Sequence, residues 1–258
     1  MSNMTLSKIT MKDLGHGVNI LDIEVPEALD CTVKCGIDFL DDAVGGEGFT
    51  PSSVMLFTGT PGAGKTTLML KMADNITAAG HICLVNNAEE SPLQVRKTVK
   101  RLKCTNGFFI GQDSKVSEII MHAKILKKKN PKKQLFLVVD SLAAVDDGFF
   151  ENGYTNSMTA VRATELLCDF AKETFAVVII VGHVTKGNVF AGRQTIKHAV
   201  DIHMHLGIDD DKKSETLGMR LLEVSKNRFG CNQRSYVLDM QSDGLREVGS
   251  FCKSDPQS

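Results

Sequence analysis

From Gly36 onward, short apolar runs alternate with stretches in which apolar residues recur every three or four positions. Continuous apolar runs that end at polar residues or glycine are typical of strands buried on both faces of a parallel sheet. The intervening stretches are typical of amphipathic helices that cover such a sheet. The alternation therefore predicts an α/β fold with a mainly parallel central sheet flanked by helices.

The parallel strands are expected at 54–57, 82–85, 108–110, 135–139 and 176–181. Helices are expected from Lys65, after Ser91, from about residue 116, and from about 158 to 173. Ser91 is a suitable N-cap because Pro92 and Gln94 occupy the first and third positions of the helix that follows.

In the C-terminal part apolar and polar residues alternate at 200–206 and much the same at 217–224, with three consecutive aspartates between the two stretches. Alternation predicts half-buried strands. We expect two to three antiparallel strands at the sheet edge, with 236–240 the last. Weak periodicity at the start predicts an arm at residues 1–34, followed by a core domain at 35–248 and a tail at 249–258.

Composition adds limits to this fold. A length of 258 residues suits one large domain, and 30 Lys and Arg nearly balance 31 Asp and Glu, so affinity for nucleic acid must come from local patches. No apolar run is long enough to span a bilayer, and the first residues lack the apolar segment of a secretory signal. Seven widely spaced cysteines favour a chain that stays reduced in the cytoplasm. Without a membrane-spanning run, we expect no membrane partner.

The most specific motif is G-x-x-x-x-G-K-[ST] at residues 59–66, between a predicted strand and a predicted helix. Glycines let backbone N–H groups turn around a phosphate at the helix N-terminus. Lys65 would reach the β- and γ-phosphates, and the Thr66 hydroxyl would bind Mg²⁺. We predict a site for ATP with Mg²⁺ that comprises Gly59, Thr60, Pro61, Gly62, Ala63, Gly64, Lys65, Thr66 and Thr67.

Three further polar residues follow predicted strands. Asp140 ends one strand and could hold Mg²⁺ through water. Glu89 follows another and could polarise the attacking water. Acids there could instead complement the dipole of the next helix, the role we expect for Glu90. His183 leaves a central strand, where it could contact the γ-phosphate or serve only the structure.

These parts, in this order, resemble the RecA superfamily and within it the RadA/Sms branch, from about residue 36 to 240. Residues 182–186 and Lys226-Asn227-Arg228-Phe229-Gly230 are more specific to that branch than the phosphate loop is. The resemblance also includes 35–41 with 45–46, 88–91, 139–141, 191–192, His198 and 200–201.

The resemblance implies an ATP-driven hexameric motor that binds single-stranded or branched DNA and promotes branch migration during recombination and repair. Lys226 and Arg228 would then reach the ATP bound to a neighbouring subunit of the homo-oligomer, like an arginine finger in trans. A basic strand end that faces solvent is the alternative.

Members of this branch carry a four-cysteine zinc module and a Lon-protease-like domain. Here only Cys31 and Cys35 stand near the position of the zinc module, too few for structural zinc, and few residues follow Met240. We therefore expect a minimal motor without zinc.

Lys186, Arg193 and Lys197, with glycines among them, resemble the second DNA-binding loop of the superfamily, although a purely structural loop is the alternative. Residues 146–158 would form the first such loop. Its Phe149, Phe150 and Tyr154 could stack on bases or pack against a neighbouring subunit. The lysines between Lys124 and Lys133 could form a solvated helix end or touch DNA.

Three functions stay open at this point: a ring-shaped helicase or branch-migration motor, a strand-exchange filament, and a nucleotide-dependent assembly protein of the KaiC type that binds no DNA. The three differ in the assembly they form and in their response to DNA, which the residues do not determine.

Overall fold

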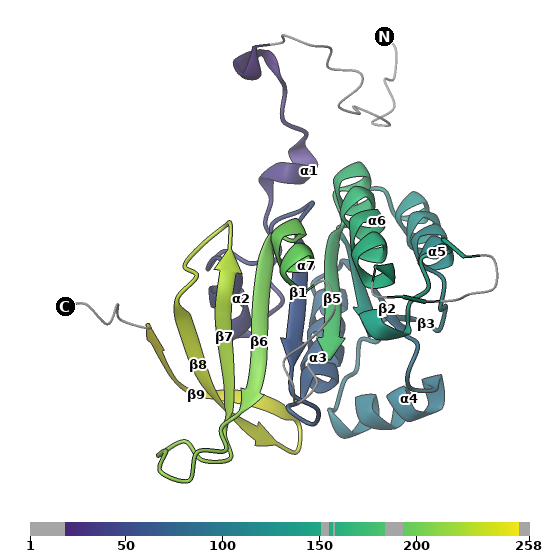
Figure 1. Cartoon of the computed structure of the whole chain (residues 1–258). Coiled ribbons are helices and arrows are strands. Elements are labelled where there is room, and N and C mark those ends of the chain that lie inside the picture. The colour runs from purple at the N-terminus through teal and green to yellow at the C-terminus, as the bar shows by residue number, and fades with distance from the viewer. Residues whose placement is uncertain (1–18, 151–154, 157, 184–192, 253–258) are drawn as a thin grey trace.

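The computed structural model describes residues 19–150, 155–156, 158–183 and 193–252. In this part of the chain one sheet of nine strands runs in the order β3-β2-β4-β5-β1-β6-β7-β8-β9, and helices lie on both sides of it (Figure 1). The first six strands in this order pair in parallel, which confirms the predicted parallel sheet. They are β1 Val54–Gly59, β2 Ile82–Asn87, β3 Phe109–Gly111, β4 Leu135–Asp140, β5 Val177–His183 and β6 Ile202–Ile208.

Two apolar cores bury the two faces of the sheet. Helices α2 (Asp38–Val44), α3 (Lys65–Ala78) and α4 (Pro92–Arg101) contribute to one core. Helices α5 (Val116–Lys129) and α6 (Thr159–Thr174), with Ile196 of α7 (Arg193–Ala199), contribute to the other. Continuous apolar runs are therefore required in the central strands, because both faces of each strand are covered.

The predicted start of α4 is confirmed. The Ser91 side chain accepts from the backbone N–H of Gln94 at 3.3 Å, and the Gln94 side chain accepts from the Ser91 N–H at 2.8 Å. This capping box satisfies donors that no helical carbonyl reaches.

The antiparallel edge has three strands, within the predicted number, but its last strand lies beyond the predicted one. It consists of β7 (Arg220–Asn227), β8 (Arg234–Gln241) and β9 (Gly244–Cys252). The expectation that 236–240 is the last strand was wrong, because β9 follows and crosses the predicted boundary at residue 248. β7 begins later than predicted, since Asp209 accepts hydrogen bonds from the hydroxyls of Ser214 and Thr216 and so extends the turn before the strand.

The segment before α2 is tied to the core by carboxylates. Asp41 accepts from the backbone N–H groups of Cys35 at 2.7 Å and Gly36 at 2.9 Å. Asp42 accepts from the Tyr236 hydroxyl at 2.7 Å and pairs with Arg234 at 2.8 Å. Asp41, one of the residues that carry the resemblance, therefore fastens this segment to α2. Asp42 fastens α2 to β8.

None of the helices in the described ranges is both long and apolar enough to cross a bilayer. Ahead of Val33, which pairs with Phe49, the chain forms the short elements η1 (Ile20–Asp22) and α1 (Glu27–Asp30), which extend beyond the end of the sheet in Figure 1.

Asp74, which is 3% exposed in α3, fastens this helix to the loop before β3. Its carboxylate accepts from the backbone N–H groups of Thr105 at 3.2 Å, Asn106 at 2.8 Å and Gly107 at 2.7 Å. Burial alone would raise the pKa of this carboxyl, but the three amides hold it below its ordinary value.

We expect Asp74→Asn to lower the free energy of unfolding by about 2 kcal/mol at pH 7, because one charged acceptor of three N–H donors is lost. A depressed folded-state pKa gives stability above the unfolded pKa of about 3.9, and this stability is lost as the pH falls through the folded-state pKa. Urea unfolding should therefore show wild type and variant converging below about pH 4. The exposed Asp210→Asn is the control, and a pH-independent difference for Asp74→Asn would contradict this account.

Candidate functional site

The parallel register brings several predicted site residues to one edge of the sheet. Gly59 at the end of β1 lies beside His183 at the end of β5, and Asn87 at the end of β2 lies beside Asp140 at the end of β4. Because parallel strands end on the same side, polar groups after different strands converge there. In Figure 1 this is the lower edge of the sheet.

The loop from Gly59 to Thr66 needs its glycines. Gly62 and Gly64 have φ angles of +76° and +106°, which side chains rarely adopt. A Cβ at Gly59 would lie 2.3 Å from the carbonyl oxygen of Leu206, and one at Gly64 would lie 2.3 Å from Cε of Met240. The loop is therefore fixed by backbone conformation and by close packing against β6 and β8.

Lys65, the first residue of α3, holds a buried positive charge at this loop. Its Nζ donates to the carbonyl oxygens of Gly59 at 2.8 Å and Thr60 at 3.0 Å, and the residue is 5% exposed. Burial lowers the pKa of the ammonium, while Asp140 and Glu89 act in the opposite direction. A buried cation beside a glycine-rich loop at the N-terminus of a helix suits an anionic ligand.

Thr66 and Asp140, the two predicted Mg²⁺ residues, lie in direct contact. The Thr66 hydroxyl donates to Oδ2 of Asp140 at 2.8 Å, and Asp140 is 4% exposed. A hydroxyl and a carboxylate oxygen next to a phosphate loop are the donor set that Mg²⁺ prefers. The residues present therefore fit Mg²⁺.

Glu89 lies at the same edge through contacts that the sequence analysis did not foresee. The Ser141 hydroxyl donates to Oε1 of Glu89, and the side-chain oxygen of Asn87 accepts from the N–H groups of Glu89 at 3.0 Å and Glu90 at 2.9 Å. Asn87 and Ser141 thus hold Glu89 in place at this edge. Their place immediately at strand ends was the signal that could have found them.

The predicted role of His183 stays a prediction. Its backbone ends β5 next to Gly59, and its side chain lies outside the described part of the structure. On β6, which pairs with the other side of β1, His203 and His205 both contact the Thr58 hydroxyl, at 3.0 Å and 3.1 Å. These two histidines thus help to join β1 to β6.

Lys226 and Arg228 lie near the opposite edge of the sheet. Lys226 donates to the carbonyl oxygens of Lys197 and His198 at 2.9 Å and of Val200 at 2.6 Å, and so caps α7. Burial lowers the pKa of Lys226, and the charge of Arg228 adds to this effect. In this conformation the role of Lys226 is structural.

Arg228 is tied to the start of β1. Its guanidinium pairs with Asp201 at 3.0 Å, and Asp201 also accepts from the N–H of Val54 at 2.9 Å. The length of β1 separates Val54 from Gly59, a distance of about 16 Å in extended strand. The two cations therefore cannot complete the phosphate site of their own chain in this conformation.

The rest of the 226–230 segment packs on the α2 region. The Asn227 side chain donates to the carbonyl oxygen of Ala43 at 3.1 Å. A Cβ at Gly230 would lie 2.9 Å from Cα of Gly45, which requires glycine there. This contact joins the two glycine-containing segments of the resemblance, 45–46 and 226–230.

The predicted DNA contacts are only partly described. Lys186 lies outside the described residues, as does Tyr154, and of Arg193 only the backbone is described, at the start of α7. Lys197 is half-buried in α7, so the end of the predicted loop is helical. Phe149 is 65% exposed, and Arg162 stacks on its ring at 4.4 Å.

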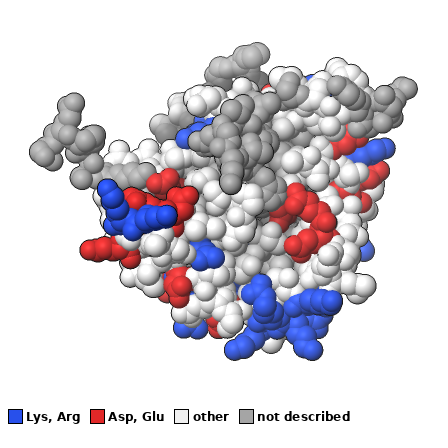
Figure 2. All heavy atoms as spheres, turned by 60° about the horizontal axis from the view of Figure 1, so that its bottom comes forward, with Lys and Arg blue, Asp and Glu red and all other residues white. Residues whose placement is uncertain are grey.

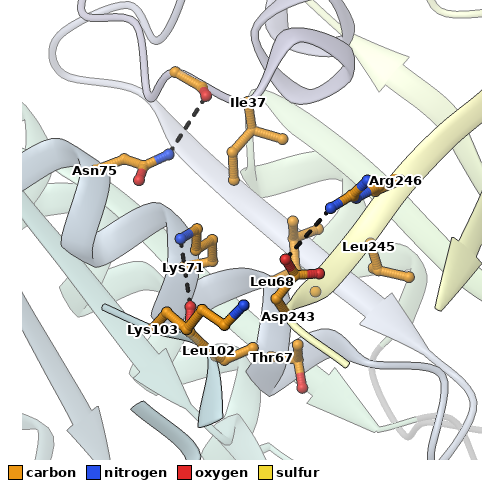
Figure 3. A pocket seen from close by; sticks show the side chains of 12 residues that line it. Ile37, Thr67, Leu68, Lys71, Asn75, Leu102, Lys103, Asp243, Leu245 and Arg246 are labelled. Atoms are coloured by element: carbon orange, nitrogen blue, oxygen red, sulfur yellow. Dashed lines mark hydrogen bonds and ion pairs between the residues drawn. The ribbon is translucent and has the colours of Figure 1, made fainter. Parts of the chain in front are cut away.

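A cavity of about 320 Å³ adjoins the phosphate loop at Thr67 (Figure 3). Its walls are apolar where Ile37, Leu68, Leu102 and Leu245 line it, and Lys71, Lys103 and Arg246 add positive charge. Arg246 also pairs with Asp243 at 3.3 Å. The cavity can hold a ring with polar edges beside a phosphate group.

Charge is unevenly distributed on the face that carries the loop edge. Figure 2, which brings the bottom of Figure 1 forward, shows Lys and Arg side chains grouped at its lower margin and acidic side chains right of centre. Helix α4 at the bottom of Figure 1 carries four exposed cations: Arg96, Lys97, Lys100 and Arg101.

Comparison with known sequences supports the nucleotide site. The profile of a family described as "ATPase: KaiC" matches residues 33–107, which include the phosphate loop and Glu89. The DNA repair protein RadA of Mycobacterium tuberculosis is 34% identical over 216 residues, or 81% of this chain and 42% of that protein. RadA of Aquifex aeolicus is 33% identical over 215 residues, 83% of this chain and 45% of that protein. The chain thus spans less than half the length of these relatives.

Among solved structures, the ATPase domain of another protein superposes with a TM-score of 0.72 over 87% of this chain and 94% of that one. The sequences are 18% identical in this alignment, so the likeness concerns the fold alone. It supports the α/β fold with a mainly parallel central sheet.

We expect Thr66→Ala to remove most of the Mg²⁺ dependence of nucleotide binding, because the variant loses one oxygen next to Asp140. Wild type should bind a non-hydrolysable ATP analogue more tightly with Mg²⁺ than with a chelator, and the variant should lose roughly 10- to 100-fold of that difference. Calorimetric titration measures both. Thr77→Ala, whose hydroxyl bonds along α3 to Ala73, is the matched control. An unchanged Mg²⁺ dependence in Thr66→Ala would refute the metal assignment.

Proposed function

Since the chain is related to the RadA branch of the RecA superfamily, we propose that it hydrolyses ATP to drive a DNA motor in recombination and repair. The observation that carries this proposal is the convergence of Lys65, the Thr66–Asp140 pair and Glu89 at one edge of the sheet. The relatives named above are DNA repair proteins, which supports DNA as the partner.

In the proposed reaction, backbone N–H groups of residues 62–66 bind the phosphates, and Lys65 moves from the loop carbonyls to the β- and γ-phosphate oxygens. Thr66 and, through water, Asp140 hold Mg²⁺, which supplies charge neutralisation of the phosphates when bound. Glu89, positioned by Ser141, orients the attacking water and accepts its proton. His183 is the proposed γ-phosphate contact, and the cavity at Thr67 receives the nucleoside.

Lys226 and Arg228 act on the nucleotide of a neighbouring copy. Their distance from the phosphate loop of their own chain supports this arrangement, since they are useful to catalysis only in trans. Their present contacts with α7 and Asp201 are the ones they would exchange for phosphate oxygens. Hydrolysis then requires a homo-oligomer, for which we propose a hexameric ring.

DNA is proposed to contact Lys186, Arg193 and Lys197. Cations on a glycine-containing segment suit a phosphate backbone whose path changes during the cycle. Helicase and branch-migration activity follow from this proposal together with ATP-driven movement in the ring.

A second candidate, a nucleotide-dependent assembly protein without DNA, is favoured by the family profile named for KaiC. A filament for strand exchange is the third. Electron micrographs with an ATP analogue distinguish closed rings from helical filaments.

The central test is the ATPase rate with and without single-stranded DNA. We expect stimulation by DNA in the wild type. Glu89→Gln should lower kcat by roughly 100-fold or more while nucleotide binding persists, because the water loses its base. Lys65→Ala should lose binding and turnover together. Turnover indifferent to DNA would favour the assembly protein, and wild-type rates in Lys65→Ala would eliminate the site.

Action in trans is tested by mixing two inactive variants. Arg228→Ala keeps its phosphate loop but lacks the cation, while Lys65→Ala keeps the cation but lacks the loop lysine. Each alone should lose at least roughly 100-fold in kcat. Their mixture should regain activity that peaks near equal amounts, because mixed interfaces unite an intact loop with an intact Arg228.

The control mixture pairs Lys65→Ala with Lys212→Ala, an exposed lysine in the turn before β7. The ATPase activity of this mixture should fall in proportion to the fraction of Lys65→Ala in it. No gain in the first mixture at any ratio would exclude catalysis across subunits by Arg228.

A further inference from the structure

Three adjacent strands, β1, β6 and β7, are joined by side chains as well as by their backbones. His203 of β6 is 2% exposed, and its Nε2 lies 3.0 Å from the hydroxyl of Thr58 on β1. Its Nδ1 makes a hydrogen bond with the hydroxyl of Ser225 on β7. We call Thr58, His203 and Ser225 the side-chain bridge. A buried imidazole costs more to desolvate than an aliphatic side chain of similar size, which indicates a use for the contacts that it makes.

Each end of the side-chain bridge adjoins a residue of the proposed reaction. Thr58 directly precedes Gly59, the first residue of the phosphate loop. Ser225 directly precedes Lys226. The bridge therefore extends from the loop of one nucleotide site to the strand that carries a cation proposed for the next site.

Backbone pairing is irregular where the bridge meets β7. His203 pairs with Lys226, and the next pair is Met204 with Val224. Ser225 is therefore an extra residue of β7, and such a bulge interrupts the ladder of backbone hydrogen bonds and re-aims side chains. The Ser225 hydroxyl also lies 3.4 Å from the carbonyl oxygen of His203. The place of Lys226 relative to β6 thus depends on side-chain contacts more than it would in a regular strand.

The partners of the Thr58 hydroxyl assign the proton on His203. This hydroxyl has one hydrogen, which it donates to the carbonyl oxygen of Met204 at 3.1 Å. It therefore accepts from the ring N–H groups of His203 and of His205, whose Nδ1 lies 3.1 Å away. With its proton on Nε2, the neutral imidazole of His203 accepts from Ser225 at Nδ1. The bridge is thus a directed chain of hydrogen bonds from Ser225 to the Met204 carbonyl.

We propose that His203 is a positioning residue that holds Lys226 at a fixed place relative to the phosphate loop of the same chain. It acts through Ser225 on one side and Thr58 on the other. This inference rests on the proposed function, because it requires that Lys226 acts on the nucleotide of a neighbouring copy. His203 touches neither nucleotide, and it sets the spacing between one site and the cation that the same chain extends to the next.

The first test replaces His203 by methionine, an unbranched apolar side chain that makes neither hydrogen bond. Thr58 keeps its contacts with Met204 and His205, so we expect His203→Met to fold. Its kcat for ATP should fall by about 10-fold or more, because the cation on β7 is no longer held in place. Its Kd for a non-hydrolysable ATP analogue should change by less than about twofold, since the phosphate loop is unaltered.

A conservative variant separates positioning from packing. The amide of His203→Gln can donate to Thr58 and accept from Ser225. This variant should recover kcat to within about threefold of the wild-type value. A role in packing alone predicts the opposite order, because methionine suits an apolar interior better than glutamine does.

A cycle with Ser225 tests whether the bridge acts as one unit. Ser225→Ala should lower kcat by about fivefold in the wild type and no further in His203→Met, because the bond that it removes is already absent there. Ser225 is exposed, so its truncation leaves no cavity in the core. This variant therefore carries the test even where His203→Met fails to fold.

The matched control is His205→Met. His205 also contacts Thr58 but lies opposite Glu223, farther along β7 from Lys226. Its kcat should stay within about twofold of the wild-type value. Wild-type kcat in folded His203→Met or in Ser225→Ala, no recovery in His203→Gln, additive losses in the double variant, or an equal loss in His205→Met would overturn the proposal.

The same ATPase assay separates this inference from the proposed function. Lys65→Ala and Glu89→Gln are measured beside the variants of the bridge. Loss of activity in these two with wild-type kcat in His203→Met and Ser225→Ala would overturn the role of His203 alone. A wild-type chain that hydrolyses no ATP would overturn both proposals.

Discussion

Parallel pairing in a shared register is the constraint on which this molecule depends. A buried parallel strand satisfies its backbone on both sides until it ends, and polar side chains can then face water or a ligand. Four such strands place Gly59, Asn87, Asp140 and His183 at one edge. The Thr66–Asp140 hydrogen bond then joins β4 to α3 across this edge, so the phosphate loop and the acid that faces it are held by the same sheet.

The two edges of the sheet differ in chemistry. The loop edge holds buried Lys65 near two carboxylates, whereas the other edge holds Lys226 and Arg228 on helix carbonyls and Asp201. In this structure Lys65, Lys226 and Arg228 all make hydrogen bonds or ion pairs with other residues of the same chain. An anionic ligand at either edge would therefore have to compete with carbonyl or carboxylate partners, and exchange of these partners for the ligand would leave no buried charge unpaired.

The sequence was sufficient for the parts of the fold whose signal is local. Buried strands appear as apolar runs, the capping box at Ser91 is a pattern of four residues, and the phosphate loop is a motif. β9 was missed because most of its residues are partly or fully exposed and its pairing with β8 starts from the two-residue turn at Ser242 and Asp243. Ser141 was missed as the partner of Glu89 because the two are 52 residues apart. Where Lys226 and Arg228 lie relative to the loop depends on pairing between β1, β6 and β7, which no local pattern encodes.

β6 links the two edges of the sheet. Asp201, which holds Arg228, precedes its first residue, and Gly59 pairs with Leu206 near its other end, about 16 Å along the strand. An inner strand with hydrogen-bonded neighbours on both sides resists stretching, so the main chain itself couples the Asp201 end of the sheet to the loop edge.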